Sequence, residues 1–536
     1  MSNKNKYIKN YFEYEYLDGW KKVTLGEALS IWAEKYNDKT AVICGSESIS
    51  YKKLNTASEE MAYGLAELGL KKEDRVIVQL PNRISFIKTL FAICKVGAVP
   101  ILALPAHRKS EIEGILKTAE PKFYIGAEKY LGYNYIPMIE ELKEKYNCLK
   151  HVIIDGKSDK YEALLSIKGS KKDFEKTDCY STAILLLSGG TTGIPKLIPR
   201  THSDYLYNAE MSARRCMVNE ESVYLAALPV GHNFTLSCPG VLGTLSAGGK
   251  VVLAKNSCPD EIMDFIDREK VTITALVPSL ASLCTEMIKC DDYYDLSSLK
   301  ILQIGGAMLE ESLAENIIEN WPCKLMQVFG TAEGLICFTG LNDDESIILN
   351  CQGRPISEAD EIKIVDICGK EVLDGQYGEL LARGPYTIDH YYMNEEADSR
   401  SFTADGFYKT GDMAQITKEG NIRIKGRIKE QINRAGEKII PSELERCLCM
   451  HDEIKEAAVV GIKDDVVGNK ICAFVLIKEA ALKKNITLSK INKFLNSLGV
   501  AQYKNLDMLK FIEAWPVTSI GKIDKKKLIK LAENAN

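Results

Sequence analysis

The chain has 536 residues, of which 46% are hydrophobic and 27% charged, and its formal net charge is −5. This length exceeds what one hydrophobic core usually supports, so we expect at least two domains. The mixed charges give no footprint for nucleic acid or a membrane surface, and 16 cysteines without a Cys-x-x-Cys pair argue against a disulfide framework or a zinc site.

No apolar signal segment opens the chain, and the longest apolar stretch, residues 90–106, is interrupted by lysine, glycine and proline. The sequence therefore predicts a cytoplasmic protein that binds neither nucleic acid nor membrane.

Apolar runs alternate with helical patterns along the first 425 residues, which predicts parallel α/β sheets. The predicted strands are residues 75–80, 152–154, 183–187, 224–228, 251–253, 272–276 and 301–304. Helices are predicted between them, for example over 51–68 and 260–269. Short strands and turns from Glu361 to Gly426 predict a smaller β-rich subdomain. The final segment predicts a separate α/β unit, with helices 442–450, 489–498 and 524–533 and strands 457–460 and 471–476.

A loop rich in glycine and hydroxyl groups follows the predicted strand 183–187. It reads Ser-Gly-Gly-Thr-Thr-Gly-Ile-Pro-Lys from Ser188 to Lys196. Glycine lets the backbone turn sharply beside a ligand, and successive amides in such a turn form a concave anion site. The loop is therefore predicted to hold phosphate. It is not a Walker A loop, because Ile194 and Pro195 separate the last glycine from the lysine.

This loop resembles the phosphate loop of the adenylate-forming superfamily, which includes acyl- and aryl-CoA ligases, nonribosomal peptide synthetase adenylation domains and firefly luciferase. Five further blocks match in the same order: Gln327–Glu333, Gly378–Leu380 with Arg383–Pro385, Tyr408–Asp412, Gly426–Glu430 with Gly436–Lys438, and Pro516–Lys522. The resemblance implies an α/β fold with a β-rich subdomain. It implies a large N-terminal domain, residues 1–428, and a small mobile C-terminal domain, residues 429–536, that carries the catalytic lysine.

The resemblance implies an enzyme that activates a carboxylic acid with ATP and Mg²⁺ and releases pyrophosphate. The implied phosphate contacts are Ser188, Gly189, Gly190, Thr191, Thr192, Gly193 and Lys196. Other implied nucleotide contacts are Gly305, Gly306, Ala307, Val328, Phe329, Gly330 and Thr331. Glu333 is implied to be catalytic and to bind Mg²⁺, since a carboxylate suits that hard ion. The family usually has threonine just before this glutamate, where this chain has Ala332.

Three more residues complete the implied adenylation site. Asp412 is expected to accept hydrogen bonds from the ribose, assisted by Arg427. Lys522 is expected to bridge the substrate carboxylate and the nucleotide, because an ammonium between two developing anions is a strong electrostatic catalyst. The lysines at 525, 526, 527 and 530 are instead predicted to form a solvated helix face.

A second half-reaction, attack by a thiol, is also implied. In the family the C-terminal domain rotates between the two steps, and we expect the hinge at Lys429 and Glu430. Gly436 and Lys438 are expected to form the loop beside the thiol tunnel.

The segment Gly231–Gly240 (GHNFTLSCPG) resembles the corresponding block of stand-alone aryl acid adenylating enzymes in siderophore pathways. The resemblance suggests that Asn233 bonds the ortho hydroxyl and the carboxylate edge, that Phe234 lines the pocket, and that His232 gates the carboxylate and is catalytic; Gly305 adjoins the acyl group. No carboxylate occurs between Leu228 and Leu242, which argues against an amino acid substrate.

Cys238 and Ile336 are expected to distinguish two aryl acids. The family's 2,3-dihydroxybenzoate enzymes carry serine and valine at these positions, and its salicylate enzymes carry cysteine and a larger aliphatic residue. Cysteine is a weak hydrogen-bond partner for a 3-hydroxyl group, and leaving that group unsatisfied costs about 1–3 kcal/mol. The sequence therefore favours salicylate, with 2,3-dihydroxybenzoate next.

The leading hypothesis is an aryl acid–AMP ligase that loads a phosphopantetheinylated aryl carrier protein in trans, because no carrier-like segment follows Lys522. Two alternatives remain: an aryl-CoA ligase, which has the same core motifs, and a non-catalytic aryl-acid-binding scaffold. The presence of Lys196, Glu333, Asp412 and Lys522 argues against the scaffold.

Overall fold

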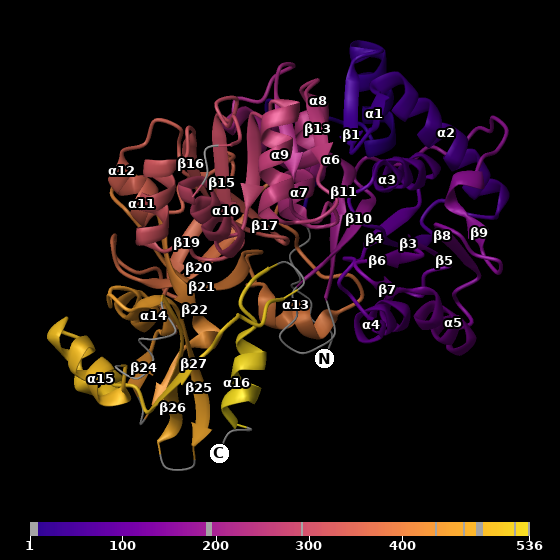
Figure 1. Cartoon of the computed structure of the whole chain (residues 1–536). Helices are drawn as coiled ribbons and strands as arrows, with labels where there is room; N and C mark the ends of the chain where they lie inside the picture. The colour runs from indigo at the N-terminus through magenta and orange to yellow at the C-terminus, as the bar shows by residue number, and fades with distance from the viewer. Residues whose placement is uncertain are drawn as a thin grey trace. The chain divides into compact units, whose positions relative to one another are not determined.

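The computed structural model describes residues 9–188, 196–290, 293–434, 437–464, 467–478, 486–518 and 521–533. The chain forms two compact units (Figure 1). The first comprises Met1–Ile362 and Ala382–Lys409, and the second comprises Lys363–Leu381 and Thr410–Asn536. Buried hydrophobic clusters fill each unit.

Two large sheets organise the described part of the first unit. The nine-stranded sheet has the order β18 (Arg354–Pro355), β17 (Gly334–Phe338), β16 (Lys324–Thr331), β15 (Ile301–Gly305), β14 (Ile273–Leu276), β12 (Val223–Ala226), β13 (Lys250–Leu253), β1 (Thr40–Cys44) and β2 (Glu47–Ser50). The seven-stranded sheet has the order β11 (Leu197–Thr201), β10 (Thr182–Leu187), β4 (Val99–Leu102), β3 (Arg75–Gln79), β5 (Phe123–Ala127), β8 (His151–Asp155) and β9 (Glu162–Ala163). The central strands of both are parallel, as their continuous apolar runs predict.

Helices connect these strands. They are α1 (Leu25–Tyr36), α2 (Tyr51–Glu67), α3 (Ile84–Val96), α4 (Lys109–Ala119), α5 (Ile136–Lys145), α6 (His202–Arg215), α7 (Asn233–Ser237), α8 (Gly240–Ser246), α9 (Pro259–Glu269), α10 (Pro278–Cys290), α11 (Glu311–Asn320), α12 (Glu345–Asn350) and α13 (Glu395–Ser401). A small hairpin, β6 (Lys129–Tyr130) with β7 (Tyr133–Asn134), and the 3₁₀ turns η1 (Tyr11–Tyr14) and η2 (Leu164–Ser166) complete the unit.

The second unit contains a three-stranded sheet of β25 (Ile454–Asp464), β26 (Gly468–Ile477) and β27 (Met508–Phe511). Helices α14 (Pro441–Cys449) and α16 (Lys525–Glu533) flank β25 and β26 (Figure 1). The unit also has α15 (Leu488–Ser497), η3 (Ile428–Glu430), η5 (Gln502–Lys504) and the hairpin β23 (Ile432–Arg434) with β24 (Glu437–Ile439). A four-stranded sheet has the order β19 (Glu361–Val365), β20 (Gly378–Arg383), β21 (Tyr408–Ile416) and β22 (Ile422–Arg427).

The predicted α/β class is confirmed, and the predicted elements recur within a few residues. The predicted helix 51–68 is α2, and the predicted strand 183–187 is β10. The β-rich stretch from Glu361 to Gly426 also holds a short helix, α13, which the sequence analysis did not anticipate. Asn394 caps that helix by accepting a hydrogen bond from the amide of Ala397.

The predicted domain boundary at Lys429 separates two parts that are expected to move relative to each other. The two compact units are instead defined by which residues pack together. The boundary therefore stays a prediction. Among the helices that the structure describes, none combines the length and the apolar character that crossing a membrane requires.

Candidate active site

The ends of the glycine-rich loop are held together by backbone contacts. Strands β10 and β11 pair in antiparallel fashion, with Leu187 opposite Leu197. The amide of Ser188 donates to the carbonyl of Lys196 over 3.0 Å, and the amide of Lys196 donates to Ser188 Oγ over 3.2 Å. The five loop residues between them that were predicted to contact phosphate lie outside the described residues: Gly189, Gly190, Thr191, Thr192 and Gly193.

Tyr391 connects the predicted phosphate lysine with the predicted magnesium ligand. Lys196 Nζ lies 4.1 Å from the centre of the Tyr391 ring, and the Tyr391 hydroxyl donates to Glu333 Oε1 over 2.9 Å. Burial raises the pKa of Tyr391, so its hydroxyl stays protonated and can only donate to the carboxylate. Tyr391 was not predicted from the sequence, because no motif or spacing marks it.

Glu333 occupies a fixed position in the turn between β16 and β17. Thr331 Oγ1 donates to the carbonyl of Gly334, and the amide of Ile388 donates to the carbonyl of Glu333 over 2.8 Å. A Cβ atom at Gly334 would lie 2.3 Å from Thr387 Cα, and its φ is +139°, so this position requires glycine. The Glu333 side chain is 8% exposed, and Oε2 accepts no hydrogen bond from a described residue. This carboxylate oxygen fits a hard cation such as Mg²⁺.

The N-terminal segment supports the backbone beside Glu333. Lys9 is buried, and its ammonium donates to the carbonyls of Pro385 over 2.6 Å and Thr387 over 2.8 Å. Burial lowers the pKa of Lys9 to about 8. Nothing in the sequence distinguished this lysine from its neighbours, because its role depends on a segment far along the chain.

The predicted aryl-binding segment forms α7 and the residues beside it. His232 caps α7, and its Nδ1 accepts the amide of Phe234 over 3.3 Å. Asn233 and Cys238 are buried, with Asn233 Nδ2 3.9 Å from Cys238 Sγ. Ile336 is buried in β17, where it pairs with Gly330 of β16.

Gly305 ends β15 and packs against the same segment. A Cβ atom here would lie 2.8 Å from the carbonyl oxygen of Val328, its partner on β16, and 3.1 Å from Phe234 Cζ. Gly306 and Ala307 follow at the exposed end of the strand. Phe329 lies on β16 between Val328 and Gly330.

We expect Gly305→Ala to lower the free energy of unfolding by about 1–3 kcal/mol, because the added methyl group overpacks this contact. Gly231→Ala is the matched control, since a Cβ there meets no atom closer than 3.5 Å. Denaturant unfolding of the two variants measures the difference. Equal stability of the two would contradict the tight contact.

Three predicted residues of the second unit act on one another. Asp412 on β21 pairs with Arg427 on β22, and Arg427 Nε lies 2.8 Å from Asp412 Oδ1. Lys522 lies in a turn in which its amide donates to Thr518 Oγ1 over 3.2 Å. Burial, with repulsion from Arg427, lowers the pKa of Lys522 to about 8, and attraction by Asp412 and Glu430 opposes this shift.

The predicted hinge, Lys429 and Glu430, lies in the 3₁₀ turn η3. Glu430 pairs with Lys525 over 3.2 Å, and Lys525 also pairs with Glu445 over 2.8 Å. The prediction that Lys525 belongs to a solvated helix face is therefore wrong, because two carboxylates from other elements bind it. Gly436 and the side chain of Lys438 lie outside the described residues.

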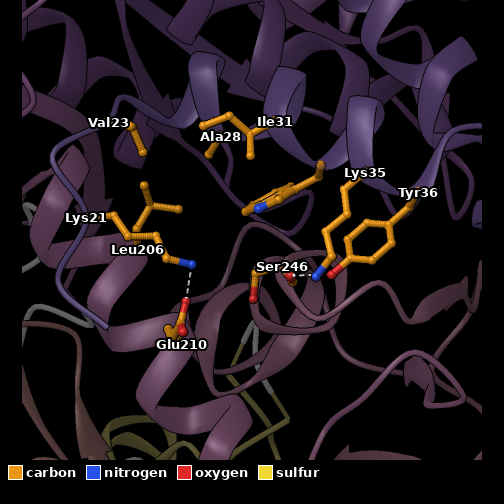
Figure 2. A pocket seen from close by; sticks show the side chains of 10 residues that line it. Lys21, Val23, Ala28, Ile31, Lys35, Tyr36, Leu206, Glu210 and Ser246 are labelled. Atoms are coloured by element: carbon orange, nitrogen blue, oxygen red, sulfur yellow. Dashed lines mark hydrogen bonds and ion pairs between the residues drawn. The ribbon is translucent and has the colours of Figure 1, made fainter. Parts of the chain in front are cut away.

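A cavity of about 170 Å³ lies elsewhere in the first unit, beside α1, α6 and α8 (Figure 2). Apolar side chains such as Val23 and Leu206 line it, and Lys21 binds Glu210 at one side. None of the predicted site residues lines this cavity.

Comparison with known proteins decides the family. The AMP-binding enzyme model matches residues 29–392, and the AMP-binding enzyme C-terminal domain model matches residues 443–522. The chain belongs to the AMP-binding enzyme family. The adenylate-forming resemblance is thereby confirmed, and the protein is an enzyme.

Several members of this family are similar to this chain along most of its length. The 2,3-dihydroxybenzoate-AMP ligase of Bacillus subtilis is 42% identical over 509 residues, covering 95% of this chain and 94% of the relative. The salicyl-AMP ligase / salicyl-S-ArCP synthetase of Mycobacterium tuberculosis is 40% identical over 519 residues, covering 95% and 91%. The apo structure of MbtA from Mycobacterium smegmatis is 37% identical with a TM-score of 0.75, covering 97% of each chain.

Proposed function

We propose that this AMP-binding enzyme joins an aryl carboxylic acid to AMP, with salicylate favoured over 2,3-dihydroxybenzoate. The carboxylate oxygen attacks the α-phosphorus of ATP, the bond to the bridging oxygen breaks, and pyrophosphate leaves. The observation that carries the proposal is the uncharged wall of α7, where the buried Asn233 amide and the Cys238 thiol adjoin each other and Phe234 packs against Gly305. The relatives named as aryl acid–AMP ligases support it.

The first unit supplies the phosphate and metal contacts in this proposal. Ser188 and Lys196, with the loop between them, bind the β- and γ-phosphates. Oε2 of Glu333, which accepts no hydrogen bond from a described residue, would bind Mg²⁺, and the ion would supply positive charge for the phosphates. Tyr391 holds the other carboxylate oxygen, so the metal-binding oxygen keeps one direction. Gly305, Gly306 and Ala307, with residues 328–331 of β16, line the adenine and acyl side.

The second unit supplies the ribose contact and the catalytic cation. Asp412, oriented by Arg427, accepts hydrogen bonds from the ribose. Lys522 stabilises the negative charge that develops between the carboxylate and the α-phosphate. His232 gates the carboxylate.

The second half-reaction transfers the aryl group to the phosphopantetheine thiol of an aryl carrier protein. The thiolate attacks the acyl carbon of the aryl-AMP, and AMP leaves. Turning about Lys429 and Glu430 withdraws Lys522 and brings the loop of Gly436 and Lys438 to the thiol. The product enters siderophore or nonribosomal peptide biosynthesis, within the cytoplasm.

ATP–pyrophosphate exchange on a panel of acids tests this function. We expect salicylate to exceed 2,3-dihydroxybenzoate by about tenfold or more, because Cys238 is a weak partner for a 3-hydroxyl. Benzoate, 3-hydroxybenzoate and amino acids complete the panel. Exchange with none of the aryl acids would refute the proposed function, and a lead for 2,3-dihydroxybenzoate would refute the selectivity alone.

Cys238→Ser is expected to raise the ratio of 2,3-dihydroxybenzoate to salicylate activation by about tenfold, because a serine hydroxyl satisfies the 3-hydroxyl group. The measurement is kcat/KM for each acid in pyrophosphate exchange. Cys284→Ser is the matched control, since Cys284 is also buried but lies in α10, a helix that contains none of the predicted site residues. A ratio that stays constant in Cys238→Ser would remove this residue from substrate selection.

A further inference from the structure

Two hydroxyl groups hold the side-chain oxygen of Asn233. The Tyr205 hydroxyl donates to Asn233 Oδ1 over 2.9 Å, and Ser237 Oγ lies 3.0 Å from the same oxygen. Tyr205 comes from α6 and Ser237 from α7, so the amide is fixed between two helices. All three side chains are buried.

A buried arginine fixes the direction of these hydrogen bonds. Arg200 has no exposed surface and pairs with Asp204 over 2.8 Å. Its Nη2 lies 3.5 Å from Asn208 Oδ1. Because a guanidinium group can only donate, Asn208 must turn its oxygen toward Arg200 and its nitrogen away.

Hydrogen bonds connect Asn208 to Asn233 through Ser237. Asn208 Nδ2 donates to the Ser237 carbonyl over 2.8 Å and lies 3.3 Å from Ser237 Oγ. Since that hydroxyl accepts from Asn208, its own proton points onward to Asn233, whose Oδ1 and carbonyl lie 3.0 and 3.2 Å away. The Arg200 guanidinium also lies 4.9 Å from the Tyr205 ring centre.

The amide of Asn233 therefore has one orientation. Its oxygen accepts from the Tyr205 hydroxyl and lies within reach of the Ser237 proton, which Oδ1 shares with the Asn233 carbonyl, so a ligand that reaches this side chain meets the Nδ2 donor. The described neighbour of Nδ2 is Cys238 Sγ, a weak acceptor 3.9 Å away. The strong donor position of this amide remains available to a substrate.

We propose that Tyr205 and Ser237 are positioning residues that make the site select aryl acids whose ortho substituent accepts a hydrogen bond. This inference rests on the proposed function and on Asn233 meeting the ortho group. A 2-hydroxyl directs its proton to the neighbouring carboxylate and offers a lone pair to Nδ2. A 2-amino group delocalises its lone pair into the ring and presents an N–H to the donor, so 2-aminobenzoate is rejected.

Tyr205→Phe tests the positioning, with kcat/KM for salicylate, benzoate and 2-aminobenzoate measured by pyrophosphate exchange. We expect the salicylate-to-benzoate ratio to fall about five- to tenfold, because the Asn233 amide is freed to turn. Benzoate itself is expected to change less than about twofold. The ratio of kcat/KM for salicylate to that for 2-aminobenzoate is also expected to fall.

Tyr51→Phe is the matched control. Tyr51 is equally buried, and its hydroxyl donates to the carbonyls of Leu245 and Gly249, none of which belongs to the predicted site. Loss of the Tyr51 hydroxyl is expected to lower the stability of the protein and to leave the kcat/KM ratios between the acids unchanged. Ser237→Ala, a smaller change, is expected to move the ratios in the same direction as Tyr205→Phe and keeps the test decisive if the latter variant folds poorly.

A double-mutant comparison separates positioning from general damage. In an Asn233→Ala background, Tyr205→Phe is expected to leave the ratio unchanged, since the amide that it orients is gone. An equal loss for salicylate and benzoate in Tyr205→Phe, or an effect that persists without Asn233, would overturn the inference. A wild-type enzyme that exchanges with no aryl acid would instead refute the proposed function itself.

Discussion

Lys522→Ala is expected to lower aryl acid activation by at least about 10²-fold, with little change in the binding of the acid. In the proposed mechanism the ammonium stabilises charge that develops only in the transition state, and losing one such group costs about 10²–10³-fold in rate. Pyrophosphate exchange measures this half-reaction. Transfer of the aryl group from supplied salicyl-AMP to a thiol acceptor is expected to continue, because the proposed rotation withdraws Lys522 in that step.

The pH profile gives an independent readout of the same lysine. Because the pKa of Lys522 is lowered to about 8, its charge is lost as the pH rises through that value, so wild-type adenylation should decline above about pH 8. Lys530→Ala, at an exposed site on α16, serves as the control and should leave activity and profile unchanged. Full activity in Lys522→Ala would exclude the proposed role.

Arg200→Met is expected to lower the free energy of unfolding by about 3–5 kcal/mol. Arg200 and Asp204 are almost completely buried, and removing one partner of a buried ion pair leaves an uncompensated charge. Denaturant unfolding followed by tryptophan fluorescence measures this effect, since Trp20, Trp32 and Trp321 all belong to the first unit.

Two further variants sharpen this test. Arg214→Met removes a half-exposed arginine that pairs with Asp18 and Glu210, and its expected cost is below about 1 kcal/mol. The double variant Arg200→Met, Asp204→Asn removes both charges, keeps an oxygen that can accept from the Thr201 amide, and is expected to recover much of the loss. Similar stabilities for Arg200→Met and Arg214→Met would contradict the expected cost of burying Asp204 unpaired.

The fold class and the positions of most elements could be predicted from the amino-acid sequence. Strand β10 and helix α2 follow from the local order of apolar and polar residues, which reflects the faces that each element must bury. The family followed from short motifs in fixed order, because phosphate-binding turns and metal-binding carboxylates restrict the residue types at consecutive positions.

The contacts between residues far apart in the chain are evident only from the tertiary structure. Tyr391 meets Lys196 and Glu333, and Lys525 meets Glu430, although no local pattern distinguishes either residue. The lysine-rich helix was predicted to have a solvated face, because hydrophobic periodicity indicates only which side of one element is buried. It carries no information about which charged groups of other elements approach that helix.

The orientation of Asn233 is the clearest example of this division. Its residue type and its neighbours in α7 were evident from the sequence, but the direction of its amide depends on Tyr205, Ser237 and, through Asn208, Arg200. A buried amide turns to match the donors and acceptors around it, and those groups come from two helices that only packing brings together. The sequence alone therefore specified which chemical groups are present, and the tertiary structure specified the directions in which they act.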